Sequence, residues 1–151
     1  MTNYISNINV NNVSYPIGGN NFDGDWIGSN YVIVSGSTLS GGSCTPYPLS
    51  SYLPDDGYDY EVMFWGGSTS QATSGRLCAV TLLSGSTTAA NGFRLGMCNA
   101  RTAATVECGG SAIIPIFASN KYVSVYIQGS SYNNTGVWVK ATGYRRIGTN
   151  D

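Results

Sequence analysis

The stretch "YDYEVMFWG" (residues 58–66) indicates the fold class of this chain. Apolar or aromatic side chains recur at every second position from Tyr58 to Phe64, and the other set of positions runs from Asp59 to Trp65. In a β-strand, successive side chains point to opposite faces of the sheet. The stretch therefore predicts a strand with one face in a core and the other face, which ends in Trp65, on the outside.

The same kind of segment recurs along the rest of the chain. Runs rich in β-branched and aromatic residues are bounded by Gly, Asn or Ser, which is typical of strands. The spacing of about 10–15 residues, with turn signals between the runs, predicts an all-β antiparallel sandwich. Pro115 places its own strand at an edge or a bulge. The further predicted strands are "YVIVSG" (31–36), "RLCAVTLLSG" (76–85), "GFRLGMCNA" (92–100), "ATVECGG" (104–110), "SAIIPIFAS" (111–119), "KYVSVYIQG" (121–129) and "GVWVKATGYRRIG" (136–148).

The N-terminal segment differs from the remainder of the chain. Residues 1–20 are rich in Asn and carry isolated apolar residues, and they end at Pro16 and a Gly-Gly pair. Such a segment cannot bury its own apolar side chains, so it predicts a short extended arm that attaches to a partner, followed by a β-sandwich domain over residues 21–151. The predicted attachment residues are Ile5, Ile8, Val10, Val13, Tyr15 and Ile17.

A long connecting region follows the arm. Residues 21–57 are rich in turn residues around the one strand already named. They also keep apolar side chains at intervals, which predicts an ordered excursion over the surface of the domain rather than disorder. The anchors of this excursion are Tyr47, Leu49, Tyr52 and Leu53.

Composition and charge exclude several classes of partner. The chain has 151 residues, of which 10% are charged, and its net charge is −1. The seven Lys and Arg residues are spread over different predicted strands, so neither nucleic acid nor a membrane surface is expected as a partner. No apolar run approaches the ~18 residues of a membrane span, and the first ten residues lack the pattern of a secretory signal, so we expect synthesis without export. A surface so poor in charge predicts burial against other subunits.

The sequence offers little catalytic chemistry. It contains no His, which removes the usual base of a serine or cysteine triad, and it contains no glycine-rich phosphate-binding motif. The acidic run "PDDGYDYE" (54–61) provides glycosidase candidates, but turn and outer-strand positions account for its carboxylates better. We therefore expect no catalytic residues, no cofactor and no metal.

Two groups of residues remain open to more than one interpretation. The cysteines lack CxxC spacing, so buried thiols are favoured over a Cys98–Cys108 disulfide and over zinc. Aromatic side chains in the long loops are candidate contacts for a glycan, and ordinary packing or subunit contact is the alternative. The four cysteines are Cys44, Cys78, Cys98 and Cys108. The candidate glycan contacts are Trp26, Tyr47, Tyr52 and Tyr132.

The second half of the chain resembles a known family. Its features are an "IPI" strand (114–116), the basic and aromatic strand "KYVSVYIQG", an N-x-G turn (134–136) and the closing run "GYRRIG" (143–148). Together these are similar to the C-terminal jelly-roll domains of head fibres and tail-fibre tips of tailed bacteriophages, particularly gut phages. The resemblance covers about residues 75–148 well and the N-terminal "YISNINVNNVSYPI" loosely, and it hardly extends to residues 21–57.

The resemblance implies a jelly-roll-like sandwich that forms a homotrimer on the virion. The implied function is a head fibre or capsid decoration protein, with other phage structural proteins and a host-surface glycan as the implied partners. A tail-fibre tip and a free lectin-like carbohydrate-binding domain are the alternatives. Alternation predicts that Arg145 and Arg146 face opposite ways, so that one reaches a neighbouring subunit and the other braces a loop through Asp55, Asp56 or Glu107. Two solvated charges that oppose edge aggregation are an equal alternative for the pair. The expected subunit-interface residues are Tyr122, Tyr126, Tyr144, Arg145 and Arg146.

Overall fold

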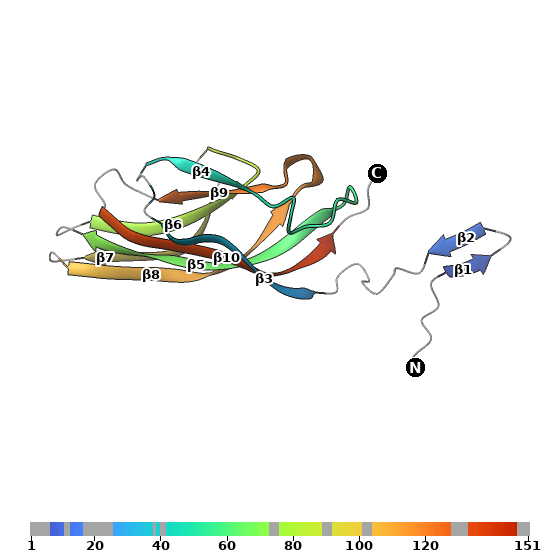
Figure 1. Cartoon of the computed structure of the whole chain (residues 1–151), viewed down its shortest axis with the longest axis horizontal. Coiled ribbons are helices and arrows are strands. Elements are labelled where there is room, and N and C mark those ends of the chain that lie inside the picture. The colour runs from blue at the N-terminus through green and yellow to red at the C-terminus, as the bar shows by residue number, and fades with distance from the viewer. Residues whose placement is uncertain are drawn as a thin grey trace.

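The protein is a two-sheet β-sandwich preceded by a separate β-hairpin (Figure 1). A computed structural model describes residues 7–10, 13–16, 26–37, 39, 42–72, 76–88, 92–100, 104–127 and 133–147. The hairpin strands are β1 (Asn7–Val10) and β2 (Val13–Pro16). The sandwich elements are β3 (Ile27–Ser37), β4 (Cys44–Pro48), β5 (Asp59–Ala72), β6 (Arg76–Ser84), β7 (Phe93–Ala100), β8 (Ala104–Ile116), the short 3-10 helix η2 (Ala118–Asn120), β9 (Tyr122–Ile127) and β10 (Asn133–Ile147).

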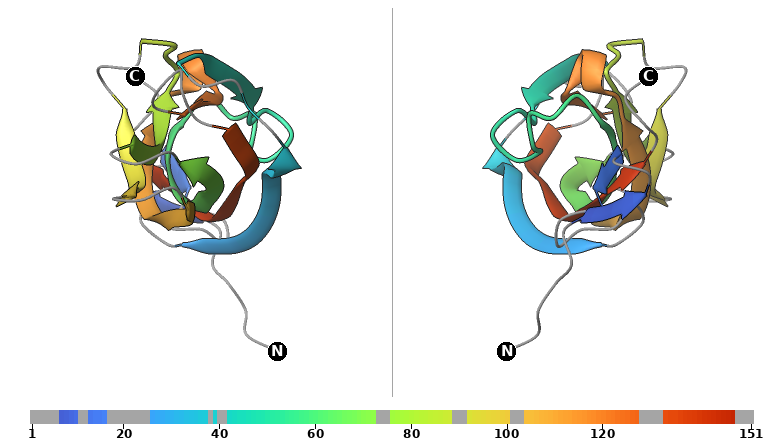
Figure 2. Two further views of the ribbon diagram at one scale, coloured as in Figure 1. Left: turned by 90° about the vertical axis from the view of Figure 1, so that its left-hand side faces the viewer. Right: turned by 90° about the vertical axis from the view of Figure 1, so that its right-hand side faces the viewer.

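The strand order identifies the sandwich as a jelly roll. The first sheet has the order β3-β10-β5-β8 and the second has the order β4-β9-β6-β7, with every pairing antiparallel. Consecutive strands thus alternate between the sheets, except where β6 pairs with β7, as in the two Greek keys of a jelly roll. Viewed along the long axis, the strands surround a common interior (Figure 2). The predicted all-β, jelly-roll-like sandwich is confirmed.

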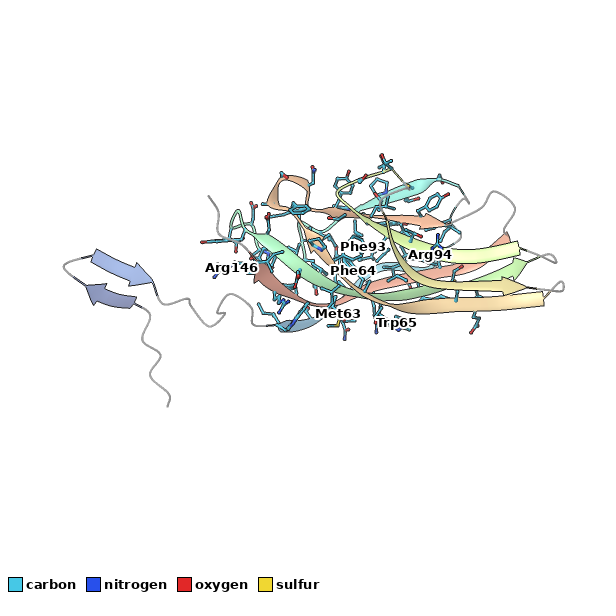
Figure 3. The ribbon with its side chains drawn as sticks, turned by 180° about the vertical axis from the view of Figure 1, so that it is seen from behind. Met63, Phe64, Trp65, Phe93, Arg94 and Arg146 are labelled. Atoms are coloured by element: carbon cyan, nitrogen blue, oxygen red, sulfur yellow. The ribbon has the colours of Figure 1, made fainter. Side chains whose placement is uncertain are left out.

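Strand β5 forms the middle of the first sheet together with β10, and its alternation is the one predicted from the sequence. Val62 and Phe64 are fully buried between the sheets. Met63 and Trp65 point out of the opposite face, as Figure 3 shows for the labelled side chains. The core continues through both sheets, and its other fully buried members include Leu49, Val80, Leu82, Ile114, Ile116, Val123, Val125, Ile127 and Val137.

The two sheets meet closely along the edges formed by β7 and β8, and glycine makes this approach possible. A Cβ added at Gly110 would collide with the carbonyl oxygen of Leu95 on β7. A Cβ at Gly96 would lie 2.6 Å from the backbone nitrogen and oxygen of Gly109. The prediction of separate strands over residues 104–110 and 111–119 is wrong. Gly109 and Gly110 allow close contact with β7, and β8 continues through them as one strand. Pro115 lies on an edge strand, as predicted.

Several strands also extend beyond their predicted limits. Strand β5 continues to Ala72 through a Gly/Ser/Thr-rich run, because β8 and β10 pair with it on both sides. Tertiary pairing here outweighs weak strand propensity. Strand β4 was not predicted, but Leu49 and Leu53, two of the expected anchors of this region, are buried.

The hairpin lies beyond one end of the sandwich, apart from both sheets (Figure 1). Asn7 pairs with Pro16 and Val10 with Val13, so this part of the expected extended arm is paired with itself. Four of the predicted attachment residues, namely those at positions 8, 10, 13 and 15, belong to the hairpin, whereas Ile5 and Ile17 lie outside the described residues. Within the described ranges, no helix has the length and apolar character needed to cross a bilayer.

Candidate ligand-binding groove

The register of the first sheet leaves a hollow on its outer face. Trp138 on β10 lies opposite Gly67 on β5, and Gly67 lies opposite Gly109 on the edge strand β8. These three residues form a row across the sheet. The Trp138 indole stands at one end of the row, and the positions on β5 and β8 have no side chain. The result is a groove of about 310 Å³, lined by Trp65, Glu107, Cys108, Gly109, Gly110 and Trp138.

The neighbouring rows form the walls of the groove. On one side, Trp65 is 44% exposed and lies between Lys140 and Ser111 in the register. The indole rings of Trp65 and Trp138 are tilted by 37°, with 6.5 Å between their centroids. On the other side, Thr69 lies opposite Glu107, and its hydroxyl donates a long hydrogen bond of 3.5 Å to the carboxylate. The groove thus has an aromatic wall and a polar wall.

Among the described residues, a cation lies beside the groove and an anion lines it. The Lys140 ammonium lies 5.0 Å from the centroid of the Trp65 ring, which is a cation–π arrangement. The Glu107 carboxylate lines the groove from β8. Because the two charges have opposite signs, the groove favours neither an anion nor a cation strongly.

The aromatic residues predicted to contact a glycan have other surroundings. Tyr52 is stacked on Tyr31 at 5.0 Å and meets the edge of Tyr144 at 5.2 Å, and Tyr47 is half-buried against the core. Burial, together with the nearby Tyr144 hydroxyl, raises the pKa of Tyr52 to about 12. Trp26 is 38% exposed. Tyr132 lies outside the described residues. The other three predicted contacts do not line the groove.

The two adjacent arginines have different partners within the chain. Arg145 donates from Nε to Glu61 Oε2 at 2.6 Å and lies 5.0 Å from the ring centroid of Trp26. Arg146 lies 4.3 Å above the ring of Tyr58, in the loop before β5. Glu61 was not among the three acidic partners expected from the sequence. Tyr144 packs edge-on against Tyr60, and the other expected interface residues, Tyr122 and Tyr126, are half-buried on β9. Their role in a subunit interface stays a prediction.

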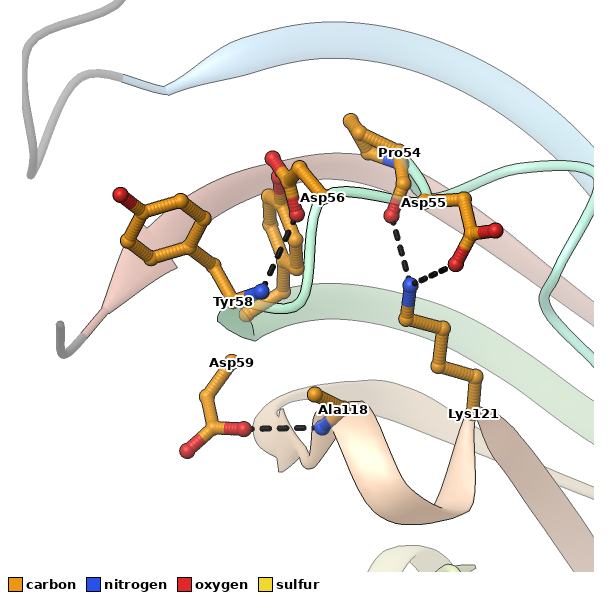
Figure 4. A network of polar contacts seen from close by, with 8 residues as sticks. Pro54, Asp55, Asp56, Tyr58, Asp59, Ala118 and Lys121 are labelled. Carbon is orange, nitrogen blue, oxygen red and sulfur yellow. Dashed lines mark hydrogen bonds and ion pairs between the residues drawn. The ribbon is translucent and has the colours of Figure 1, made fainter. Parts of the chain in front are cut away.

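The acidic run before β5 is used to hold loops together (Figure 4). Asp55 pairs with Lys121 at 3.2 Å, and Asp59 accepts a hydrogen bond from the backbone N–H of Ala118 at 2.8 Å. Asp56 accepts two hydrogen bonds, one from the Tyr60 hydroxyl at 2.5 Å and one from the backbone N–H of Tyr58 at 3.1 Å. These contacts give each of the three aspartates a partner within the chain. Asp55 and Asp56 precede β5, and Asp59 is its first residue.

The described cysteines behave as apolar residues. Cys108 is buried and Cys44 is half-buried, and both are thiols, so the Cys98–Cys108 disulfide left open by the sequence is not formed. Burial raises the pKa of the Cys44 thiol. The side chains at positions 78 and 98 lie outside the described set. Among the described side chains, no group of three metal-ligating residues gathers at one place.

The groove was not predicted, although part of its signal was present in the sequence. Alternation had already placed Trp65 on an outer face. The strand containing Trp138 was also predicted, but its register against Gly67 was not, because residues far apart in sequence form that pairing. The searches against family models, curated proteins and solved structures returned no match to this chain.

Proposed function

We propose that this chain is a structural and adhesive protein of a bacteriophage particle, most consistent with a homotrimeric head fibre or capsid decoration protein. The N-terminal segment attaches to other phage structural proteins, and the jelly roll projects from the surface. A tail-fibre tip is the alternative location within the same class. On this proposal the chain is made in the cytoplasm of the host bacterium, needs no cofactor and carries out no catalysis.

The observation that carries the proposal is the division of the chain into two parts. The strands β1 and β2 pair with each other and lie beyond one end of the sandwich, so the hairpin is available for a contact elsewhere. The sandwich has its own continuous core and does not need the hairpin to cover it. Jelly rolls occur in viral capsid proteins and in lectins, so the fold agrees with display and adhesion but does not by itself assign either.

The test combines solution mass with incorporation into particles. Light scattering on a sizing column should give about three times the 15.9 kDa of one chain. A tagged full-length chain, expressed during infection, should copurify with phage particles, and a chain lacking residues 1–19 should stay soluble and folded but leave the particle fraction. Incorporation of the truncated chain at the level of the full-length chain would refute the attachment role of the N-terminal segment. A monomeric mass would refute the trimer.

A second function, that of a free carbohydrate-binding domain, is favoured by one specific observation. The outer face of the first sheet places the exposed Trp65 beside the half-buried Trp138 at a groove. A monomer that binds glycans and never enters a particle would favour this second function over the virion protein.

A further inference from the structure

The floor of the groove is kept bare by the pairing of β5 with β8. A Cβ added at Gly67 would strike the carbonyl oxygen of Cys108 on β8, and one added at Gly109 would lie 3.1 Å from the carbonyl oxygen of Gly66. Gly67 therefore accepts only glycine while β5 and β8 keep their present spacing. The strand pairing that forms the sheet thus also keeps the middle of the groove free of a side chain.

The shape of the groove suits part of a polymer. It crosses from the centre of the sheet at Trp138 to Gly109 on the edge strand β8, and Gly109 is exposed, so one end of the groove lies at the margin of the outer face. Its volume of about 310 Å³ lies at the lower end of the range for small-molecule sites. One or two monomer units of a longer polymer can lie across Gly67 and Gly109, while the rest of the polymer continues past β8.

The chemistry of the walls selects a neutral ligand with hydroxyl groups. Indole faces attract the flat apolar face of a ring, and the partly exposed Trp65 offers such a face beside Trp138. The Glu107 carboxylate accepts hydrogen bonds from hydroxyl groups, which are charge-assisted and therefore strong. Lys140 at the Trp65 ring opposes a cationic ligand, and Glu107 opposes an anionic one.

We propose that this groove binds a neutral glycan, with a sugar ring against the indoles of Trp65 and Trp138 and its hydroxyls hydrogen-bonded to Glu107. This inference deepens the adhesive part of the proposed function and rests on it. It locates adhesion on the outer face of the β3-β10-β5-β8 sheet rather than on the loop aromatics expected from the sequence.

The first experiment is affinity electrophoresis of the full-length protein in native gels. The gels contain one polysaccharide each: neutral glucan, mannan, galactan or xylan, anionic polygalacturonate, or cationic chitosan. We expect retardation by at least one neutral polymer and a smaller effect of the charged ones. Retardation by none of the neutral polymers, or by the charged polymers alone, would overturn the proposal.

Matched variants then locate the site. Trp65→Ala and Trp138→Ala should each weaken binding by about tenfold or more, which is the size expected for the loss of one aromatic stacking partner. Glu107→Gln should weaken it less, because the amide oxygen still accepts. Phe117→Ala is the control, since Phe117 is an equally exposed aromatic outside the groove. Unchanged binding by both tryptophan variants, with circular dichroism melts like the wild type, would overturn the assignment.

A fluorescence measurement tests the site without disturbing its walls. The chain has three tryptophans, and two of them line the groove, so Trp26→Phe leaves the groove as the source of tryptophan emission. A retained oligosaccharide should change that emission and should still bind this variant. Binding without an emission change, or loss of binding in Trp26→Phe, would place the ligand elsewhere and contradict the proposal.

The remaining outcomes separate this inference from the proposed function. A second copy of the chain is the competing occupant, because Val32 and Ile113 on the same face are 62% and 47% exposed. If Trp65→Ala lowers the solution mass and the wild type binds no glycan, the face is a subunit contact and the glycan inference fails. Particle incorporation of full-length Trp65→Ala is scored in parallel, and normal incorporation with no glycan binding by the wild type overturns this inference alone.

Discussion

The hydrogen bond from Tyr60 to Asp56 links the core to the loop that precedes β5, and its removal has a calculable effect. Tyr60 is 3% exposed, and its hydroxyl donates to Asp56 Oδ2 at 2.5 Å. In Tyr60→Phe the ring stays in the core and only this bond is lost. A hydrogen bond to a charged group contributes roughly 1.5–3 kcal/mol. Because the Asp56 carboxylate is exposed and water replaces the lost donor, we expect the lower end, about 1.5 kcal/mol at pH 7.

The effect should depend on pH in a defined direction. Burial alone would raise the pKa of Asp56, but the hydrogen bonds from Tyr60 and Tyr58 and the charge of Arg146 outweigh it and lower that pKa below its ordinary 3.8. A lowered carboxyl pKa stabilises the folded state above about pH 3.8 and loses this effect as the pH falls through the folded-state pKa. The destabilisation by Tyr60→Phe should therefore shrink at pH 2.5 toward the roughly 0.5–1 kcal/mol of a neutral hydrogen bond.

Urea unfolding at pH 7 and pH 2.5, at one protein concentration, measures this difference. Tyr58→Phe is the matched control, because it also deletes one tyrosine hydroxyl but keeps the backbone N–H that binds Asp56. The control should change the free energy of unfolding by less than about 0.5 kcal/mol. An equal loss for Tyr60→Phe at both pH values, or a loss no larger than the control, would refute the reasoning.

Three further predictions concern the core, the close approach of β7 and β8, and the hairpin. Phe64→Ala should lower the free energy of unfolding by about 3–5 kcal/mol, because it empties a fully buried site, whereas Phe93→Ala at an exposed position should cost far less in the same urea titration. Gly110→Ala should lower the melting temperature measured by circular dichroism, because its Cβ meets a backbone carbonyl of β7, and Gly28→Ala, which has open space around it, should leave that temperature nearly unchanged. Deletion of residues 1–19 should leave the melting transition of the sandwich in place, and loss of a cooperative transition would show that the hairpin supports the core.

The fold could be predicted from the sequence where one face of a strand is buried. The alternation from Tyr58 to Trp65 identified the inward and outward faces of β5 correctly, because burial on one side enforces a period of two. Pro115 identified an edge for an equally local reason. The two glycines at 109–110 were misinterpreted as a break, because a local sequence cannot show that a second strand lies against them.

The groove depends on alignment between distant strands, and that is why it escaped prediction. Trp138 and Gly67 are 71 positions apart in the numbering, and they meet only through the register of β10 on β5. Glu61, the partner of Arg145, was missed for the same reason. Arg145 on β10 and Glu61 on β5 are brought opposite each other only by the register of these two strands. A single sequence provides side-chain types and local alternation, but it contains no direct signal for such pairings.

The position of β10 also has a consequence for synthesis. It is the last strand in chain order, yet it lies inside the first sheet between β3 and β5. While the ribosome is still making residues 133–147, β3 has no neighbour in that sheet and one edge of β5 is bare. The nascent domain thus presents open strand edges until its final segment emerges, and only then can the core close. We therefore expect the ribosome-bound chain to be sensitive to protease up to that point and to become resistant in a single late step.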